Sequence, residues 1–419
     1  MSQRLLWLSQ LVPYPPHAGV LLRAYHLLRG VAQQFEVDLV AFVQQSWLKT
    51  CFGDVETGLV ESRRALSEFC AHVDFVDIPA EVSPLGRYGL AARSLLGPDG
   101  YTMLWLRSAP ARQLLRERAR LTAYDHVHCD TISLAGYRDL FPEATGTLGH
   151  HNIESHMMLR RAELENNAAK RWFFSQEAGK LLRAERHVAN LFDAHITCSE
   201  LDNERLIAGA GLMNAIAVPN GVDTEFFQPG FAERVPNTLV FVGTMDWYPN
   251  AAAMTFFLDE VWPLLCADRP EITLGIVGSK PSAALRAMAE RDPRVRVYGY
   301  VPDVRPYLAG ATLFVCPIRD GGGTKLKILD AMAMGCGIVA HPIACEGINV
   351  HDNGDVLLAS TAEEFSRAID RLLKDSATVV RLGTAARELA VNEYSFAAIG
   401  SEFARDLHGI VERRAARHA

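Results

Sequence analysis

The chain carries, at residues 316–335, the segment Cys316-Pro-Ile-Arg-Asp-Gly-Gly-Gly-Thr-Lys-Leu-Lys-Ile-Leu-Asp-Ala-Met-Ala-Met-Gly335. It continues from the apolar run Leu313–Cys316, which predicts a buried β-strand. Three consecutive glycines then lead into a predicted helix that begins near Thr324 and stops at Gly335. A strand, a glycine loop and a helix in this order predict an anion site, because the loop and the helix N-terminus gather unpaired N–H groups.

The candidate ligand-binding residues of this segment are Gly321, Gly322, Gly323, Thr324, Lys325 and Asp330. Glycine lets the backbone approach a ligand closely, and a lysine in the first turn of a helix is unfavourable unless an anion offsets it. The carboxylate of Asp330 can accept hydrogen bonds from sugar hydroxyls. These features predict a site for a nucleoside diphosphate and its ribose. The alternative is a flexible turn before a core helix, with Lys325 and Asp330 solvated.

Short apolar runs alternate with helical patterns along the whole chain, in two tandem sets. The first set of expected strands is Leu5–Ser9, Val37–Phe42, Val73–Val76, Val127–Cys129, Gly146–Gly149 and His195–Cys198; the second is Leu239–Gly243, Ile272–Gly278, Val295–Tyr298, Leu313–Cys316, Ile338–Ala340 and Val356–Leu358. Helical patterns lie between them, including Val20–Gln34, Ala109–Leu121 and one long helix over Glu154–Asn190. This alternation predicts parallel sheets covered by helices on both faces.

The fold class is therefore α/β, with two doubly wound, Rossmann-like domains. The loop Pro219–Pro236 is rich in Gly, Pro, Asn and Asp and marks the boundary. We expect one domain over residues 1–218, a second over 219–395, and a last helix over 396–419 that can cross back to the first domain. Ligands of such sheets bind at the carboxyl ends of the strands, so we look for chemistry in a cleft between the two domains.

Composition narrows the class of protein. The 419 residues are 49% hydrophobic and 22% charged, which excludes a disordered chain. The formal net charge of -7 lacks the basic excess typical of nucleic-acid binders. No two of the 8 cysteines have C-x-x-C spacing, and we expect buried, reduced thiols. Residues 1–16 do not resemble a signal peptide, and no run reaches the ~20 apolar residues of a spanning helix.

Five motifs, the last of them within the segment 316–335, follow one another along the chain: Pro13-Tyr-Pro-Pro-His-Ala-Gly19, His150-His-Asn-Ile-Glu-Ser155, Val218-Pro-Asn-Gly-Val-Asp223, Phe241-Val-Gly-Thr-Met-Asp-Trp-Tyr-Pro-Asn250 and Asp330-Ala-Met-Ala-Met-Gly335. In type and order they resemble glycosyltransferase family 4, a group of retaining enzymes with the GT-B fold. The resemblance covers nearly the whole chain. It implies a glycosyltransferase of the hexosyl-transferring type, with the acceptor side on residues 1–218 and the nucleotide-sugar site on residues 219–395.

Two departures from the family pattern concern the donor site. The family's paired acids, Glu-x7-Glu, place the first acid at Gly322, so Asp320 is a possible substitute, and the second acid is Asp330 rather than Glu. The family's basic pair would fall in Thr244–Asn250, after Gly243, where no base occurs. Lys325 is then our candidate for the missing charge. A variant branch with a Gly-Gly-Gly-Thr-Lys donor loop explains both changes.

The resemblance also implies roles for residues outside this loop. Gly19 and Glu346 would lie by the donor, and Arg23, His150, Asn152 and Glu154 would lie on the acceptor side. His151 would orient the transferred sugar, Asp130 would touch the acceptor, and Lys325 would act with them in catalysis. Each residue also has a structural interpretation. Gly19 is then a loop glycine, Arg23 a solvated arginine, His151 a strand-end histidine bonded to backbone, and Glu346 a turn cap.

We expect no metal and no cofactor beyond the sugar nucleotide. No D-x-D motif occurs, which favours metal-independent transfer, and a cluster of His126, His128, His150 and His151 lacks the acidic ligands of a metal site. The expected partners are a nucleotide-sugar donor and a lipid-linked or saccharide acceptor, with no nucleic acid.

The basic, aromatic-containing stretches 112–120, 160–161 and 170–186 form either a solvated face or a peripheral membrane contact of the N-terminal domain. We therefore expect a cytoplasmic protein, or one at the inner face of the membrane. Polysaccharide or glycolipid biosynthesis is the expected role. A nucleotide-sugar epimerase on the same fold and a non-catalytic nucleotide-sugar binder are the alternatives.

Overall fold

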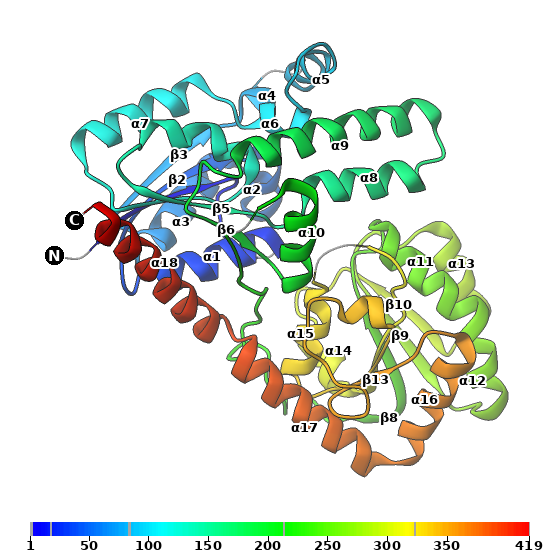
Figure 1. The fold of residues 1–419 in the computed structure, drawn as a ribbon. Coiled ribbons are helices and arrows are strands. Elements are labelled where there is room, and N and C mark those ends of the chain that lie inside the picture. Colours follow the sequence, from blue (N-terminus) through cyan, green and yellow to red (C-terminus); the bar gives the residue numbers. More distant parts are fainter. Residues whose placement is uncertain (1–2, 17–18, 83–84, 213, 322–323, 419) are drawn as a thin grey trace. The chain divides into compact units, whose positions relative to one another are not determined.

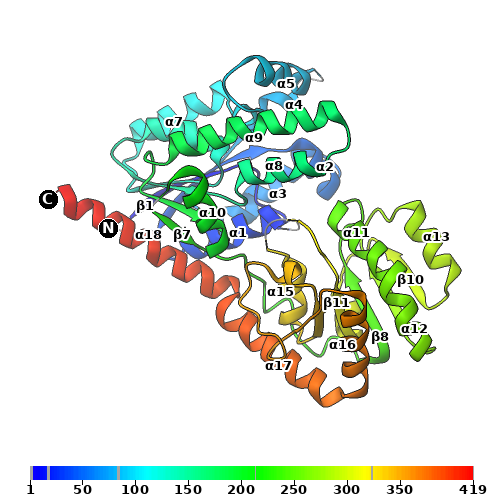
Figure 2. The same ribbon diagram turned by 45° about the vertical axis from the view of Figure 1, so that its right-hand side comes forward.

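The computed structural model describes residues 3–16, 19–82, 85–212, 214–321 and 324–418. The chain divides into two compact units, of which unit 1 holds residues 1–219 and 399–419 and unit 2 holds residues 220–398. In each unit, helices cover both faces of a central sheet (Figures 1 and 2). The two units are described separately below.

The described part of unit 1 contains a seven-stranded parallel sheet with the order β3-β2-β1-β4-β5-β6-β7. Its strands are β1 (Arg4–Ser9), β2 (Glu36–Val43), β3 (His72–Asp77), β4 (His126–Cys129), β5 (Thr145–Gly149), β6 (Ala194–Thr197) and β7 (Ala215–Ala217). The six strands expected in this part of the chain are confirmed. The strand β7 was not predicted; it has only three residues, which are half-buried.

The core of unit 1 lies on both faces of this sheet. Leu5 and Trp7 of β1 pack in one apolar cluster, whereas Leu6 and Leu8 pack in another. Successive side chains of a strand point to opposite faces, so a strand covered on both sides is mostly apolar, and its polar side chains need buried partners. This is why the buried strands could be recognised from short, continuous apolar runs.

The helices of unit 1 are α1 (Gly19–Val31), α2 (Gln45–Phe52), α3 (Val55–Leu66), α4 (Pro79–Val82), α5 (Gly86–Leu96), α6 (Tyr101–Trp105), α7 (Ala109–Leu121), η1 (Ile132–Leu140), α8 (Glu154–Leu164), α9 (Ala168–Val188) and α10 (Glu200–Ala210). The prediction of one long helix over Glu154–Asn190 is wrong. Asn167 ends it by accepting hydrogen bonds from Ala169 N and Lys170 N, which caps a second helix. The chain therefore folds back as the hairpin α8–α9 (Figure 1).

Unit 2 contains, among its described residues, a six-stranded parallel sheet with the order β10-β9-β8-β11-β12-β13. Its strands are β8 (Val235–Val242), β9 (Thr273–Val277), β10 (Val295–Gly299), β11 (Ala311–Cys316), β12 (Gly337–Ala340) and β13 (Leu357–Leu358). Its helices are α11 (Tyr248–Phe256), η2 (Phe257–Val261), α12 (Trp262–Asp268), α13 (Ala283–Arg291), α14 (Arg305–Gly310), α15 (Leu326–Ala333), η3 (Pro342–Cys345), α16 (Ala362–Lys374) and α17 (Ser376–Glu393). All six strands expected here are confirmed.

The last helix, α18 (Phe396–His418), begins in unit 2 and continues into unit 1. Within unit 1 it packs directly on α1 through two glycines. A Cβ added at Gly30 would lie 2.6 Å from the Cα of Gly400. Any larger side chain at either position would push the two helices apart.

Strand order indicates where each unit binds ligands. In unit 1 the order reverses between β1 and β4, and in unit 2 it reverses between β8 and β11. Doubly wound sheets bind ligands at the carboxyl ends of strands beside such a reversal. The residues after these four strands are therefore the first to examine.

Candidate functional site

The glycine loop of unit 2 follows β11, as predicted, and leads into α15. Gly321 has φ +106°, a left-handed conformation that favours glycine. The helix does not begin near Thr324, as expected, but at Leu326. Gly322 and Gly323 lie outside the described residues. The helix ends at Ala333, and Gly335 with φ +66° follows it, which confirms the predicted stop.

Lys325 is not in the first turn of α15, because its backbone is extended at φ -84° and ψ 93°, and it occupies the N-cap position. Its ammonium Nζ donates a hydrogen bond of 2.7 Å to the carbonyl oxygen of Gly321. The side chain thus spans the loop that precedes it. Asp320, the possible substitute for the first acid, is also bound to the loop, since its Oδ1 accepts from Gly321 N at 2.6 Å.

Two buried polar atoms of unit 2 have no hydrogen-bond partner among the described residues. They are Thr324 Oγ1, which lies between the glycine loop and α15, and Glu346 Oε2, which follows η3 after β12. A buried polar atom without a partner costs free energy. Both residues were candidates from the sequence, and both follow neighbouring strands of the sheet.

Asp330 lies on α15, and burial raises its pKa to about 7, although nearby Lys327 acts to lower it. Lys327 is one turn earlier on the same helix face. Burial lowers its pKa to about 8, with Cys316 and Asp330 raising it and Lys325 lowering it further. Lys327 was not among the predicted site residues. Its spacing of three residues from Asp330, which places both on one face of a helix, could have indicated it.

The environment of Lys327 is built by the carboxyl end of β8. Its Nζ donates a hydrogen bond of 2.6 Å to Asn250 Oδ1 and lies 4.6 Å from the ring centre of Phe241. Gly243, a predicted donor-site residue, leaves the space for it. A Cβ at Gly243 would lie 2.4 Å from that Nζ.

In unit 1, Asp130 follows β4 and His151 follows β5. Their atoms Oδ1 and Nε2 lie 3.1 Å apart, in an ion-pair contact whose angle does not make a hydrogen bond. Burial acts to raise the pKa of Asp130, but His151, His128 and Arg23 together hold it below its ordinary value. Its other oxygen accepts from Ser9 Oγ at 3.4 Å. The structure therefore brings together His151 and Asp130, which the sequence analysis had named separately.

His150 points elsewhere. Its Nε2 lies 3.0 Å from His195 Nδ1, and His195 Nε2 lies 3.2 Å from the carbonyl oxygen of Ala189. Burial lowers the pKa of His150 well below its ordinary value and that of His195 to about 4. Both rings are neutral at pH 7 and buried, and the described contacts of the His150 ring are with His195.

The remaining candidates of unit 1 are Arg23, Glu154, Gly19 and Asn152. Arg23 is buried rather than solvated and donates from Nη1 to the carbonyl oxygen of Pro219 at 2.8 Å. Glu154 begins α8, and burial raises its pKa to about 7 despite nearby His151. Gly19 is the exposed first residue of α1, and Asn152 is half-buried in the turn before α8.

The described residues contain no group of three or more histidine, cysteine or acidic side chains placed to hold a metal ion. His126 and His128 are buried in the sheet and hydrogen-bond to threonines: His126 Nδ1 lies 2.7 Å from Thr145 Oγ1, and His128 Nδ1 lies 2.8 Å from Thr147 Oγ1. All 8 cysteines are free thiols, and Cys129, Cys198 and Cys316 are buried as expected.

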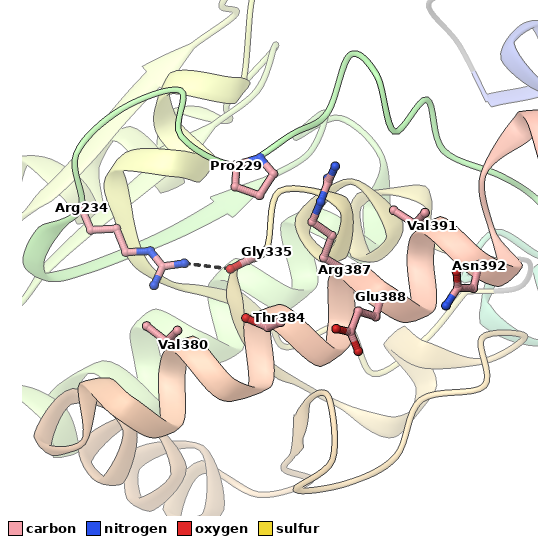
Figure 3. Close-up of a pocket in the computed structure, with 10 residues that line it drawn as sticks. Pro229, Arg234, Gly335, Val380, Thr384, Arg387, Glu388, Val391 and Asn392 are labelled. Atoms are coloured by element: carbon pink, nitrogen blue, oxygen red, sulfur yellow. Dashed lines mark hydrogen bonds between the residues drawn. The ribbon is translucent and has the colours of Figure 1, made fainter.

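A groove of about 430 Å³ lies on unit 2 at the other end of α15 (Figure 3). Arg234 Nη2 donates to the carbonyl oxygen of Gly335 at 2.8 Å, and Arg387 donates to those of Ala333 and Phe227. Cations near the last carbonyls of a helix stabilise its C-terminus. None of the predicted site residues lines this groove. Both arginines hydrogen-bond to carbonyl oxygens at the C-terminal end of α15.

Comparisons with known proteins agree with this geometry. Residues 236–375, most of unit 2, match the family described as glycosyl transferases group 1. The chain is 27% identical over 219 residues to the alpha-maltose-1-phosphate synthase of Mycobacterium tuberculosis, a match that covers 44% of this chain and 54% of that protein.

Two solved structures share the whole fold. The sucrose-phosphate synthase of Thermosynechococcus elongatus matches with a TM-score of 0.68 at 17% identity, over 100% of both chains. Anabaena HepE, solved in complex with UDP, matches with a TM-score of 0.66 at 16% identity, over 97% of this chain and 100% of that one. The fold is GT-B. With its glycosyl transferases group 1 domain, the chain is a glycosyltransferase.

Proposed function

We propose that this enzyme is a retaining glycosyltransferase that moves a sugar from a nucleotide-diphosphate donor to an acceptor. The donor binds at the carboxyl edge of the unit 2 sheet, and residues of unit 1 serve the acceptor. Retention follows the resemblance to glycosyltransferase family 4. The product is a glycolipid or a polysaccharide, the common role of that family.

One observation supports the donor site above all others. Thr324 Oγ1 and Glu346 Oε2 are buried without partners among the described residues, next to a loop and helix N-terminus that offer N–H groups. Lys327 adds a partly buried positive charge, and Asp330 adds a carboxyl group for ribose hydroxyls. A diphosphate and its sugar would satisfy such a set of donors and acceptors together.

The chemistry requires stabilisation of the leaving group. The bond from the anomeric carbon to the β-phosphate oxygen breaks, and its electron pair stays on that oxygen. The acceptor oxygen bonds to the same carbon, and its proton passes to the released diphosphate or to solvent. Fixed N–H groups and a lysine stabilise the developing negative charge. We therefore propose transfer without a metal ion, so that activity persists in a chelator.

The paired residues of unit 1 suit the other reactant. Asp130 stays ionised beside His151, and this pair can orient a hydroxyl or hold the transferred sugar. Glu154, with a pKa near 7, is a second carboxyl group near His151 that can exchange a proton at neutral pH. We favour uridine as the nucleoside of the donor, because HepE, which shares the fold, was solved with UDP and UDP-glucose.

A peripheral membrane contact would suit a lipid-linked acceptor. Among the described residues, no helix is both long and apolar enough to cross a membrane. The segment around α5 exposes Leu85, Tyr88 and Leu96 at 72%, 76% and 92%, and Arg87 and Arg93 accompany them. Exposed apolar side chains beside arginines favour the surface of anionic lipid. We propose that unit 1 docks there, at the inner face of the membrane.

The proposed function is tested by incubating the purified chain with UDP-, GDP-, ADP- and TDP-linked sugars without metal. At 100 times its dissociation constant, a donor adds about 2.7 kcal/mol of stability, which a thermal shift detects. One donor should be consumed with an acceptor, and NMR should show the same anomeric configuration in donor and product. Conversion of a donor alone into another sugar nucleotide would indicate an epimerase. Binding without turnover would indicate a non-catalytic binder.

Membrane docking has its own test. Co-sedimentation with vesicles of anionic and of neutral lipid should show binding to the anionic ones only, and Leu96→Ser with Tyr88→Ser should reduce it. The matched control is Val380→Ser, an exposed apolar residue of unit 2. Equal sedimentation of the wild type and the double variant would reject this surface.

A further inference from the structure

The two lysines of the donor loop have different surroundings. Lys325, the sequence candidate for the phosphate charge, already donates from Nζ to the carbonyl oxygen of Gly321 at 2.7 Å. Lys327, two residues later, points to the end of β8, where its Nζ donates to Asn250 Oδ1 at 2.6 Å. Lys325 therefore hydrogen-bonds to its own loop, whereas Lys327 hydrogen-bonds to Asn250, which is distant in the sequence.

The charge of Lys327 is only partly compensated. Within the described ranges its ammonium makes no ion pair of 4.0 Å or less. A lysine ammonium has three donors, and Asn250 accepts from one of them. The ring of Phe241, 4.6 Å away, offers only a weak electrostatic contact. Lys327 is partly buried, and a cation that is removed from water with one neutral partner is costly unless an anion joins it.

The neighbours of Lys327 hold this arrangement in place. Asn250 is buried, and its Nδ2 donates to the carbonyl oxygen of Thr244 at 2.8 Å, so its Oδ1 must face the lysine. Gly243 leaves room for Nζ, because a Cβ there would lie 2.4 Å from it. Gly278 in turn lets β9 approach, since its own Cβ would lie 1.8 Å from the carbonyl oxygen of Gly243. The backbone thus leaves a space that the ammonium occupies.

We propose that Lys327 is the residue that binds the diphosphate of the donor, and that Asn250 and Gly243 position its ammonium for this task. The proposal rests on the proposed function and extends it to a particular cation. The segment Thr244–Asn250 has no base of its own. Lys327 supplies that charge. It lies in the first turn of α15, beside the N–H groups that the helix presents at its N-terminus.

The lowered pKa of Lys327, about 8, fits this role. The groups that act on it are Asp330 of the same helix, Cys316 at the end of β11 and Lys325 at the N-cap. The ammonium is still mostly protonated at pH 7, and a diphosphate beside it would raise its pKa. Donor binding should therefore be coupled to protonation of this one side chain.

The test uses UDP and uridine as probes in isothermal titration at pH 7, with the full chain. Lys327→Met should weaken UDP binding by about 30-fold or more, because a buried charge partner is lost. Lys325→Met should weaken it by less than tenfold, since its ammonium is already engaged. The matched control is Lys280→Met, an exposed lysine of unit 2 paired with Asp246. The affinity for uridine, which has no phosphate, should not change in any variant.

The outcomes separate this proposal from the proposed function. If wild type binds UDP and Lys327→Met binds it equally well, Lys327 is not the diphosphate ligand, and the donor site itself stands. If wild type binds none of UDP, GDP, ADP and TDP, both proposals fail.

A second measurement covers the case in which the Lys327 variant does not fold. Lysine side-chain NMR of the wild type should show one ammonium with a pKa near 8 that rises by a unit or more with UDP. Absence of that rise would overturn the proposal.

Discussion

The two units share one architecture and differ at the carboxyl edges of their sheets. In unit 1 the polar side chains at that edge contact one another: His150 contacts His195, Asp130 contacts His151 and Ser9, and Arg23 donates to Pro219, although His151 Nε2 makes no hydrogen bond to a described residue. In unit 2 the same edge leaves Thr324 Oγ1 and Glu346 Oε2 without partners among the described residues. It also leaves Lys327 with one neutral acceptor.

This difference indicates what each edge binds. The Asp130 carboxylate of unit 1 already lies beside His151 and Arg23, so that edge needs no added charge and can hold a neutral hydroxyl. The unit 2 edge has a partly buried cation without an anionic partner among the described residues, which an anionic ligand would complete. This difference supports the proposal that the charged part of the donor binds to unit 2, and four measurements test it.

The largest expected effect comes from Gly243→Val. Its side chain would meet Lys327 Nζ and Asn250 Nδ2, which are the ends of flexible side chains, so the fold should persist while the ammonium is displaced. We expect UDP affinity to fall by about 100-fold, as for loss of a buried charge partner. Titration calorimetry measures it. Gly310→Ala is the control, since the nearest atom to its Cβ is 3.8 Å away; an unchanged affinity in Gly243→Val would break the comparison.

The second effect concerns acid stability. The four fully buried histidines among the described residues, His126, His128, His150 and His195, all lie in unit 1. Burial lowers the pKa of His128 and His195 to about 4, from an unfolded value of 6.5. The native state thus binds fewer protons than the unfolded state between these values. The stability from each neutral ring is complete above pH 6.5 and is lost as pH falls towards 4.

At pH 5 this loss amounts to about 2 kcal/mol for each such histidine, roughly 30-fold in the unfolding equilibrium. Amide hydrogen exchange at pH 7 and pH 5, corrected for the intrinsic rate, should show β4–β6 losing protection before β8–β12. Simultaneous loss in both units would contradict the expected difference.

A third, smaller effect separates binding from turnover. His151→Ala should lower kcat by about tenfold, because the pair with Asp130 is lost, while the dissociation constant for UDP stays within about twofold. His187→Ala, an exposed histidine of α9, is the matched control. A large loss of UDP affinity in His151→Ala would place the diphosphate against unit 1 and contradict the assignment.

The smallest effect is the pH dependence of UDP binding. With a free pKa of about 8, Lys327 loses its proton as pH rises from 7.0 to 8.5, so affinity should fall by about fourfold. Lys327→Met should abolish this dependence, and uridine binding should not show it. A flat profile in the wild type would mean that another group carries the charge.

Much of the fold could be predicted because buried parallel strands form continuous apolar runs. The twelve expected strands are all present, whereas β7, which has only three half-buried residues, was not predicted. Helix ends were harder. The break at Asn167 depends on one cap, and the start of α15 depends on the bond from Lys325 to Gly321, neither of which periodicity records.

Site candidates could be proposed from the sequence where a residue closely follows a strand, as Asp130, His151 and Gly243 do. Lys327 was missed because its role depends on Asn250, which is 77 residues away in the sequence. The contact of His150 with His195 was missed because the two are 45 residues apart in the sequence. Proximity in the chain identified candidates, but only the fold shows which of two neighbouring lysines or histidines faces the edge.

The most direct test of the central claim is hydrogen–deuterium exchange of the wild-type chain with and without UDP. We predict that UDP protects residues 241–250, 324–330 and 345–348 of unit 2, which surround Lys327, Thr324 and Glu346. The edge of unit 1 around Asp130 should change little. Protection at Arg234 and Arg387 instead, or only in unit 1, would contradict the assignment of the diphosphate to the carboxyl edge of unit 2.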